Sequence, residues 1–416
     1  MSKENMVIRS ITYTIDLNNI ESKTYLEYVE KNINKIKEEY CKENIEIRTI
    51  RFNIISIKEL QYSQNEILLN KIASLSLFTQ RLGLRWFNIS FDLIDSTKEY
   101  VNQVCELSLE ILKEYENAFV NLIIASNYIN NYAAYKAAQT INKVSKISEN
   151  GIDNFRFGVS LNIQPNTPFF PFSYSNTIDS FSIAVETTKS VVKTIKEKFN
   201  HDYVQLKEDI IQSMMLDLKL YDSIASSIMD NENIQYNGQD ISLSPYPDEN
   251  ISVIEILNLL GLDNFGSNGT QFLTSYLTSI LKEAIQVSGI KAIGFNGVMY
   301  SLLEDHLMCE AHDKKNFSID SIILYSTVCG CGLDMVPLPG NSLSEEIASM
   351  ILDVATTSIK LNKPLGVRVL PIPNKLENEK TNLKLDFLTN TLIPEVKHIH
   401  IDHSLFEINR FYVKAK

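Results

Sequence analysis

The first half of the chain alternates between short apolar segments with strand character and longer segments with helical periodicity. The period-two alternation in residues 7–15 is only partial, as in a strand buried on both faces. Tyr25, Val29, Ile33 and Ile36 then recur at spacings of four and three, the stripe of an amphipathic helix. Helical patterns separate most of the further strand candidates, which lie at 45–55, 86–93, 119–125, 155–163 and 179–185. Strands that alternate with helices pair in parallel through right-handed crossovers, so the pattern predicts an α/β fold.

The second half of the chain is richer in helical patterns. These cover residues 253–260, 270–287, 298–312 and 342–361, with short strands predicted near Ile241, Ile293 and Val367. The most polar and turn-rich passage lies at 231–238 and separates two predicted pseudo-halves, 1–230 and 239–396, of one domain spanning residues 1–416. A period-two pattern near the C-terminus predicts a hairpin over 397–416.

Composition excludes several classes of protein. The 416 residues carry a formal charge of -12, and the basic side chains are scattered, whereas nucleic-acid binding needs a clustered basic surface. No apolar run reaches the roughly 18 residues of a membrane helix, and the polar N-terminus lacks the features of a secretory signal. Five cysteines, an odd number in a long chain, fit reduced thiols better than a disulfide framework. We therefore expect a soluble cytoplasmic protein that binds neither nucleic acid nor membranes.

The segment from Cys329 to Gly340 combines two cysteines, three glycines, two prolines and Asp334. Glycine lets a backbone approach a ligand closely and proline sets the exit geometry, so the composition predicts a shaped loop at a site. Cys329 and Cys331 would point to the same side of an extended segment, and either is a candidate nucleophile if a cation or a helix N-terminus lowers its pKa. The alternative is that both are small buried residues that fill space beside glycine.

Two arginines and one glycine-containing loop are candidates for binding an anion. Arg156 and Arg368 interrupt otherwise apolar strand patterns, and a buried arginine requires a carboxylate or an anionic ligand. The loop residues Asn268, Gly269 and Thr270 lead directly into the next predicted helix. They either present backbone N–H groups to an anion or simply cap that helix.

Acidic residues and one histidine are candidates for acid–base chemistry. Glu304, Asp305 and His306 are consecutive on a predicted helix, so at most two of them share a site. His306 is a candidate general base, and the alternative is a solvated turn of helix. Asp248 and Glu249 follow a Pro-Tyr-Pro segment in a rigid acidic loop, where they bind a metal or an amine or cap the next helix.

A resemblance to a known family is carried by six blocks of sequence: Asn166–Pro171, Phe181–Glu186, Asp240–Pro245, Phe265–Thr270, Cys329–Gly340 and Pro364–Pro373. In this combination they resemble the domain-of-unknown-function 711 family, and the Gly-Leu-Asp-Met sequence at 332–335 is the most specific of them. The resemblance covers about residues 7–373. It implies a pyruvate formate-lyase-like α/β barrel of about ten strands, arranged as two half-barrels and surrounded by helices.

The resemblance implies a fold more than an activity. In glycyl-radical enzymes of that fold a cysteine loop enters the barrel centre, and the Cys329–Cys331 segment invites comparison with it. Those enzymes also carry a radical glycine in an Arg-Val-x-Gly-Tyr block near the C-terminus. No such block occurs in this sequence, and Gly366–Val369 does not match it. Glycyl-radical chemistry is therefore not expected, and the family carries no activity over to this chain.

The leading hypothesis is an enzyme that acts on a small anionic metabolite in the barrel centre, with no cofactor assigned. Cys329 or Cys331 would be the reactive thiol, and Asp334 or His306 would transfer protons. The ligand contacts would be Arg156, Arg368, Asn268, Gly269 and Thr270. One alternative is a non-catalytic metabolite-binding regulator that works with a small ligand-sensing protein. Another is a metal-dependent hydrolase built on Asp248, Glu249, Asp334 and His306. Assembly into a homo-oligomer is left open.

Overall fold

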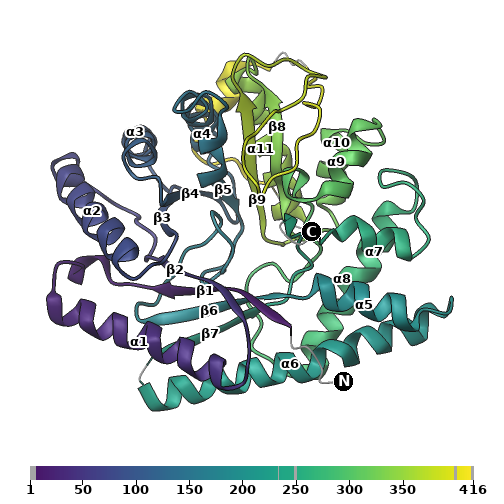
Figure 1. The fold of residues 1–416 in the computed structure, drawn as a ribbon. Helices are drawn as coiled ribbons and strands as arrows, with labels where there is room; N and C mark the ends of the chain where they lie inside the picture. The colour runs from purple at the N-terminus through teal and green to yellow at the C-terminus, as the bar shows by residue number, and fades with distance from the viewer. Residues whose placement is uncertain (1–5, 233, 248–250, 398–400, 414–416) are drawn as a thin grey trace.

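The computed structural model describes residues 6–232, 234–247, 251–397 and 401–413, and its strands form one mixed sheet of nine strands with helices packed around the outside (Figure 1). The strands are β1 (Val7–Thr14), β2 (Ile47–Asn53), β3 (Phe87–Asp92), β4 (Ala118–Ala125), β5 (Phe157–Leu161), β6 (Ser180–Glu186), β7 (Gln235–Asp240), β8 (Gly332–Pro339) and β9 (Leu365–Ile372). The α-helices are α1 (Lys23–Lys42), α2 (Asn65–Arg81), α3 (Lys98–Glu114), α4 (Asn131–Val144), α5 (Thr188–Lys198), α6 (Tyr203–Glu232), α7 (Val253–Leu259), α8 (Thr270–Ser288), α9 (His306–Asp313), α10 (Ile319–Tyr325) and α11 (Ser344–Lys360).

The strand order is β7-β6-β1-β2-β3-β4-β5-β9-β8. Strands β1 to β5 are parallel to one another, as the alternating pattern of the first half predicts. Strands β6 and β7 are parallel to each other, and so are β8 and β9. Because β6 is antiparallel to β1 and β9 is antiparallel to β5, the outer strands run opposite to the central five. The predicted α/β class is confirmed.

The two edge strands, β7 and β8, both contact the segment 292–301. Isolated parallel bridges join Gln239 to Ala292, Leu243 to Val298, and Ser301 to Asp334. Within the described residues these contacts are single bridges and not strands, so strand pairing does not close the sheet. The barrel of about ten strands that the resemblance implied is thus seen as an open sheet of nine.

The predicted helix over 298–312 is divided, because Asp305 interrupts it. Its carboxylate accepts hydrogen bonds from the N–H groups of Leu307 and Met308, which makes it the N-cap of α9. The same carboxylate accepts from the Ser252 hydroxyl. The helix therefore begins at His306, and the residues before it form a bridge to β8 and a short 3-10 turn at Leu302–Glu304.

The segment predicted as a loop from Cys329 to Gly340 is mainly the buried edge strand β8. Proline lacks the N–H needed for a sheet ladder, but an edge strand tolerates it, which accommodates Pro337 and Pro339. Gly332 has φ of +89°, and a Cβ there would collide with the carbonyl oxygen of Gly366 on β9. Close backbone approach, and not a flexible loop, explains the glycine.

The connection between β5 and β6 folds back over the inner face of the sheet, which is the face turned away from the surrounding helices (Figure 1). The carbonyl oxygen of Pro168 accepts hydrogen bonds from Thr12 and Arg51, and that of Ser173 accepts from the Asn88 side chain. Polar residues on the strands are therefore paired with loop backbone, as buried polar groups require.

Two glycines make room for this inserted connection. A Cβ at Gly158 or Gly366 would lie 2.9 or 2.5 Å from ring carbons of Phe172. Side chains at these two positions on neighbouring strands would displace the ring, so glycine lets the connection lie against the sheet.

The described C-terminal residues 401–413 do not form the predicted hairpin. They contain a 3-10 helix, His403–Glu407, whose Phe406 is buried and stacked on Tyr135 of α4 with ring centroids 4.9 Å apart. Phe411 pairs with Ile129 in an isolated antiparallel bridge. Burial of Phe406 on α4 replaces strand pairing within the segment. No helix in the described residues is both long and apolar enough to span a membrane.

Candidate functional site

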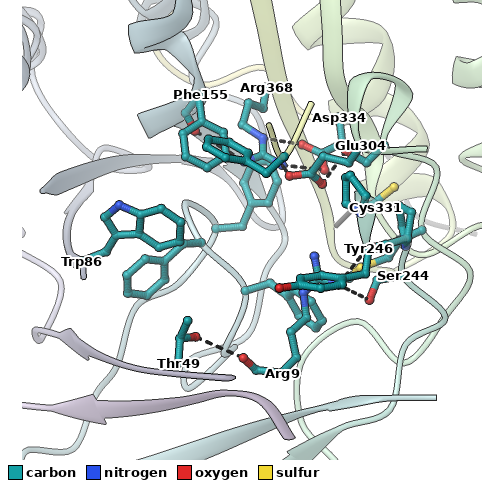
Figure 2. Close-up of a pocket in the computed structure, with 18 of the residues that line it drawn as sticks. Arg9, Thr49, Trp86, Phe155, Ser244, Tyr246, Glu304, Cys331, Asp334 and Arg368 are labelled. Carbon is teal, nitrogen blue, oxygen red and sulfur yellow. Dashed lines mark hydrogen bonds and ion pairs between the residues drawn. The ribbon is translucent and has the colours of Figure 1, made fainter. Parts of the chain in front are cut away.

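A cavity of about 150 Å³ lies over the inner face of the sheet, beside the connection between β5 and β6 (Figure 2). Five arginines contribute to its lining: Arg9 from β1, Arg48 and Arg51 from β2, Arg85, and Arg368 from β9. Glu304 and Asp334 also line it. Cationic side chains from the central parallel strands and from β9 therefore converge on one cavity.

Arg368 and the two carboxylates form a buried cluster. Arg368 donates through Nε to Asp334 Oδ1 at 2.6 Å and through Nη2 to Oδ2 at 2.9 Å, a bidentate ion pair. Glu304 Oε1 lies 3.6 Å from Arg368 Nη2, and Ser301 donates to Glu304 Oε2 at 2.7 Å. Burial raises the pKa of Asp334, although the charge of Arg368 opposes that shift. Figure 2 shows both carboxylates on the side of Arg368.

Arg51 differs from Arg368 because it forms no ion pair with a carboxylate among the described residues, although the charge of Glu304 acts on it from a longer distance. Its side chain is buried, and it donates to the Ser10 and Thr12 hydroxyls and to the Pro168 carbonyl through Nε and Nη2. Its Nη1 donates to no described residue. The guanidinium carbon lies 4.1 Å from the centre of the Phe170 ring. Burial lowers the pKa of Arg51 to about 9, with smaller effects in the same direction from the charges of Arg9 and Arg368.

Arg9 and Arg48 lie beside Tyr246 at another part of the cavity. Arg48 forms a bidentate pair with Glu186 at 2.7 and 2.9 Å, and its guanidinium lies 4.2 Å from the centre of the Tyr246 ring. Arg9 Nη1 donates to the Ser244 hydroxyl at 3.1 Å and to a backbone carbonyl at 2.8 Å. Arg48 is thus neutralised by a carboxylate, whereas the Arg9 hydrogen bonds recorded in the structure go to neutral oxygens.

One side of the cavity is a continuous wall of aromatic rings. The Trp86 ring centre lies 5.3 Å from that of Phe119 and 5.8 Å from that of Phe155. Phe155 and Phe119 are 5.2 Å apart, and Phe155 and Phe387 are 5.3 Å apart. Exposed Arg85 lies over Trp86 at 4.1 Å. These edge-to-face and tilted contacts hold the rings in fixed positions beside the charged groups.

The two predicted thiols have different positions. Cys331 lines the cavity, whereas Cys329 is buried beside it, outside the described lining. A hydrogen bond from Cys331, helped by the charge of Lys363, lowers the pKa of Cys329. The same hydrogen bond, together with burial, raises the pKa of Cys331. The thiolate character therefore lies on the cysteine away from the cavity, and Cys331 presents a protonated thiol.

Arg156 has a structural role, because it binds backbone carbonyls away from the cavity. It is buried at the end of a 3-10 helix, Ile152–Arg156, and donates to the carbonyl oxygens of Leu112, Tyr115 and Ala118 and to Asp153. These carbonyls lie at and just beyond the C-terminus of α3, where backbone acceptors lack helical partners. The cavity lining, as far as the chain is described, does not include Arg156.

The other predicted contacts are not brought together with the cavity. Thr270 is the first residue of α8, accepts a hydrogen bond from Gly266 N–H and donates to the Ser267 carbonyl, and the N-cap is Gly269, which provides no side-chain cap. His306 is the first residue of α9. None of Asn268, Gly269, Thr270 and His306 is in the described lining.

Asp248 and Glu249 lie outside the described residues, directly after a lining segment that ends at Pro247. Elsewhere, in the parts of the chain that the structure describes, no group of three or more histidine, cysteine, aspartate or glutamate side chains is arranged to hold a metal ion.

Sequence reasoning missed Arg9, Arg48, Arg51 and the aromatic wall. Arg48 and Arg51 interrupt an apolar strand pattern in the same way as Arg368, so the same signal identifies them. The wall has no such signal, because its rings come from separate segments and aromatic residues are common in any core.

Comparison with known proteins shows one family. The model of the family described as "Uncharacterised ACR (DUF711)" matches residues 1–384. A UPF0210 protein of Pyrobaculum aerophilum is 29% identical over 223 residues, which covers 52% of this chain and 49% of that protein. A UPF0210 protein of Lactobacillus delbrueckii subsp. bulgaricus is 28% identical over 311 residues, 72% of this chain and 67% of that protein.

The chain spans only about half the length of the Pyrobaculum relatives it matches, with shares of 49% to 56%. The family match, in contrast, extends over most of the chain and includes the strands that carry Arg9, Arg51, Asp334 and Arg368. The chain therefore belongs to the uncharacterised DUF711 family.

Proposed function

We propose that this protein is an enzyme that acts on a small anionic metabolite bound in the cavity. The observation that supports the proposal is Arg51, a buried guanidinium that lines the cavity and has no carboxylate partner among the described residues. Leaving a charge buried without a counter-ion is costly. An anionic ligand that accepts from the open Nη1 of Arg51 removes that cost.

The charge balance of the cavity supports the same conclusion. Its five arginines face the two lining carboxylates, Glu304 and Asp334, and one further carboxylate, Glu186, which pairs with Arg48. The described surroundings are thus cationic, although the whole chain has a formal charge of -12. A cationic cavity in an acidic protein concentrates anions locally.

Glu304 replaces His306 as the proton-transferring residue of the proposal. Both carboxylate oxygens of Asp334 accept hydrogen bonds from Arg368, so Asp334 positions that arginine. Glu304 keeps its Oε1 at 3.6 Å from Arg368 and lines the cavity, where it can accept a proton from a bound ligand. Cys331 also lines the cavity, but its S–H hydrogen is engaged within the protein and its pKa is raised.

A pyruvate formate-lyase-like barrel is the architecture we propose around the cavity. The segment 292–301 bridges β7 and β8 in parallel and would act as a tenth strand. With β6, β7, β8 and β9 it would form a half-barrel that runs opposite to the half formed by β1 to β5. This arrangement would leave the cavity inside the barrel.

A non-catalytic metabolite-binding regulator is the second candidate. The pKa of Cys331 is raised, and both oxygens of Asp334 are hydrogen-bonded to Arg368. Among the described lining residues, Glu304 is then the one carboxylate left for proton transfer, which favours a protein that binds a ligand without converting it. A small ligand-sensing partner protein, or assembly of several copies, would then carry the signal. Turnover of a bound ligand separates the two candidates.

The proposal is tested by measuring whether small anions raise the melting temperature of the purified protein. Acetate, succinate and inorganic phosphate are the probes. We expect at least one to stabilise the wild type and the Arg81→Met control, because Arg81 is exposed on α2, and not to stabilise Arg51→Met. The Arg51→Lys variant keeps the positive charge, so stabilisation by an anion in this variant separates loss of the charge from a folding defect in Arg51→Met. If neither these anions nor benzoate shifts the melting temperature of the wild type, the proposal is wrong.

A further inference from the structure

The size of the cavity restricts the ligand. A volume of about 150 Å³ matches that of an engineered protein cavity known to hold benzene. There is room for one six-membered ring with one or two small substituents. A nucleotide or an adenine-containing coenzyme is larger than this volume.

The aromatic wall selects a flat ligand. Trp86, Phe119, Phe155 and Phe387 present ring faces and edges whose centres lie 5.2 to 5.8 Å apart in consecutive contacts. The rings pack on one another edge-to-face or tilted, and the guanidinium of Arg85 lies over Trp86 and Phe387. An aromatic ligand on such a wall gains about 0.5–1.5 kcal/mol beyond the burial of its area, which a saturated ring does not.

The charged side of the cavity selects a carboxylate. Arg51 lies on the Phe170 ring and Arg368 lies 5.3 Å from the centre of Phe155, so guanidinium groups border the wall. Arg368 is already paired with Asp334, which leaves Arg51 as the buried charge that lacks a counter-ion among described residues. A guanidinium fork matches a planar carboxylate. A phosphate with two negative charges would be repelled by Glu304 and Asp334 more strongly than a carboxylate with one.

Glu304 selects a hydrogen-bond donor on the ligand. It is held by Ser301 through Oε2, and its Oε1 is 3.6 Å from Arg368 Nη2, beyond a good hydrogen bond. A hydroxyl or amino group of the ligand can donate to this oxygen. A second carboxylate on the ligand would be repelled by it.

From these four restrictions we infer that the ligand is a small aromatic carboxylic acid that carries one hydroxyl or amino group. Its carboxylate would accept from Arg51, its ring would lie against the Phe155 side of the wall, and its donor group would bind Glu304. The inference rests on the proposed function and adds the chemical class of the ligand.

Calorimetric titration with four probes tests the inference: para-hydroxybenzoate, benzoate, cyclohexanecarboxylate and inorganic phosphate. Benzoate should bind about two- to tenfold more tightly than cyclohexanecarboxylate because only benzoate stacks on the wall. The added hydroxyl should improve affinity by about tenfold or more through its bond to a charged acceptor. Trp86 is the single tryptophan of the chain, so its fluorescence gives an independent readout of occupancy.

Three variants assign the contacts. Arg51→Met should abolish binding of both benzoates, Phe155→Leu should remove the preference for benzoate over cyclohexanecarboxylate, and Glu304→Gln should reduce the advantage of the hydroxyl while benzoate still binds. Arg81→Met is the matched control and should bind like the wild type.

The outcomes separate the inference from the function on which it rests. Equal affinity for benzoate and cyclohexanecarboxylate, or binding of phosphate alone, would overturn the aromatic acid and leave an anion-binding cavity in place. No binding of any of these probes, combined with the absence of stabilisation by acetate and succinate, would overturn both.

Discussion

Arg51 and Arg368 are both buried arginines on strands, and their surroundings give them different roles. Arg368 is neutralised by Asp334 in a bidentate pair and is held in place by it. Arg51 donates to hydroxyls and a backbone carbonyl and forms no ion pair with any described residue. Arg368 therefore has a structural role in the cavity, and Arg51 is the residue that we propose to bind the ligand.

Replacing Asp334 by asparagine should destabilise the protein by about 3–5 kcal/mol, because Arg368 then becomes a buried charge without its bidentate partner. Denaturant unfolding monitored by circular dichroism measures this loss. The double variant Asp334→Leu with Arg368→Met, which removes both charges, should be more stable than Asp334→Asn. A double variant that is less stable would show that the ion pair itself stabilises the fold.

Acid should weaken the fold through His312. Burial lowers the pKa of His312, whose Nδ1 lies 3.2 Å from the Thr391 hydroxyl. The unfolded chain then binds a proton at a higher pH than the folded chain, so stability is full above the ordinary histidine value of about 6.5 and falls as the pH drops below it. Unfolding measured across this window should show a smaller pH slope in His312→Gln. An unchanged slope would assign the acid sensitivity to other groups.

At the scale of elements, the connection between β5 and β6 is the feature that shapes the cavity. It contributes Phe169, Phe170 and Phe172 to the lining, and its carbonyl oxygens accept hydrogen bonds from strand side chains. The block Asn166–Pro171, which carries part of the family resemblance, lies in this connection, and its position over the sheet depends on contacts with distant strands. The family block at 329–340 was assigned the wrong element, since an edge strand can contain prolines that a central strand cannot.

Gly366→Ala should destabilise the protein by about 1–3 kcal/mol, because the new methyl group would lie 2.5 Å from the Phe172 ring. Thermal unfolding measures the loss. Adding Phe172→Leu, which shortens the opposing side chain, should recover part of the stability of Gly366→Ala. If the two changes are simply additive, the contact does not limit packing at Gly366.

At the scale of the whole molecule, the segment 292–301 decides whether the cavity is enclosed by a continuous sheet. Its backbone exchanges hydrogen bonds with the β7 side, since Leu243 N–H donates to Gly297 at 3.0 Å and Met299 N–H donates to Leu243 at 2.8 Å. The buried Asp240 carboxylate accepts from the Phe295 and Ser242 N–H groups and ties the same segment to the end of β7.

Hydrogen exchange should therefore protect the amides of Ile293 and Met299 to an extent comparable with strand β7. Asp240→Asn, which weakens the acceptor at the junction, should speed exchange in 292–301 more than in the parallel strands β3 and β4. Rapid exchange of Ile293 and Met299 in the wild type would contradict the proposed tenth strand.

The α/β class and the approximate positions of strands β1 to β6 could be predicted from the sequence, because those elements follow from hydrophobic periodicity along neighbouring residues. The sequence also identified Arg368, Asp334 and Cys331 as candidates, because strand-embedded charges and glycine-rich segments are local signals. Tertiary structure alone decided that Arg156 closes the end of α3, and that Arg9 and Arg51 join a cavity walled by Trp86 and its neighbours. Those relations depend on which strands are adjacent, and pairing between distant segments leaves no trace in the spacing of residues along the chain.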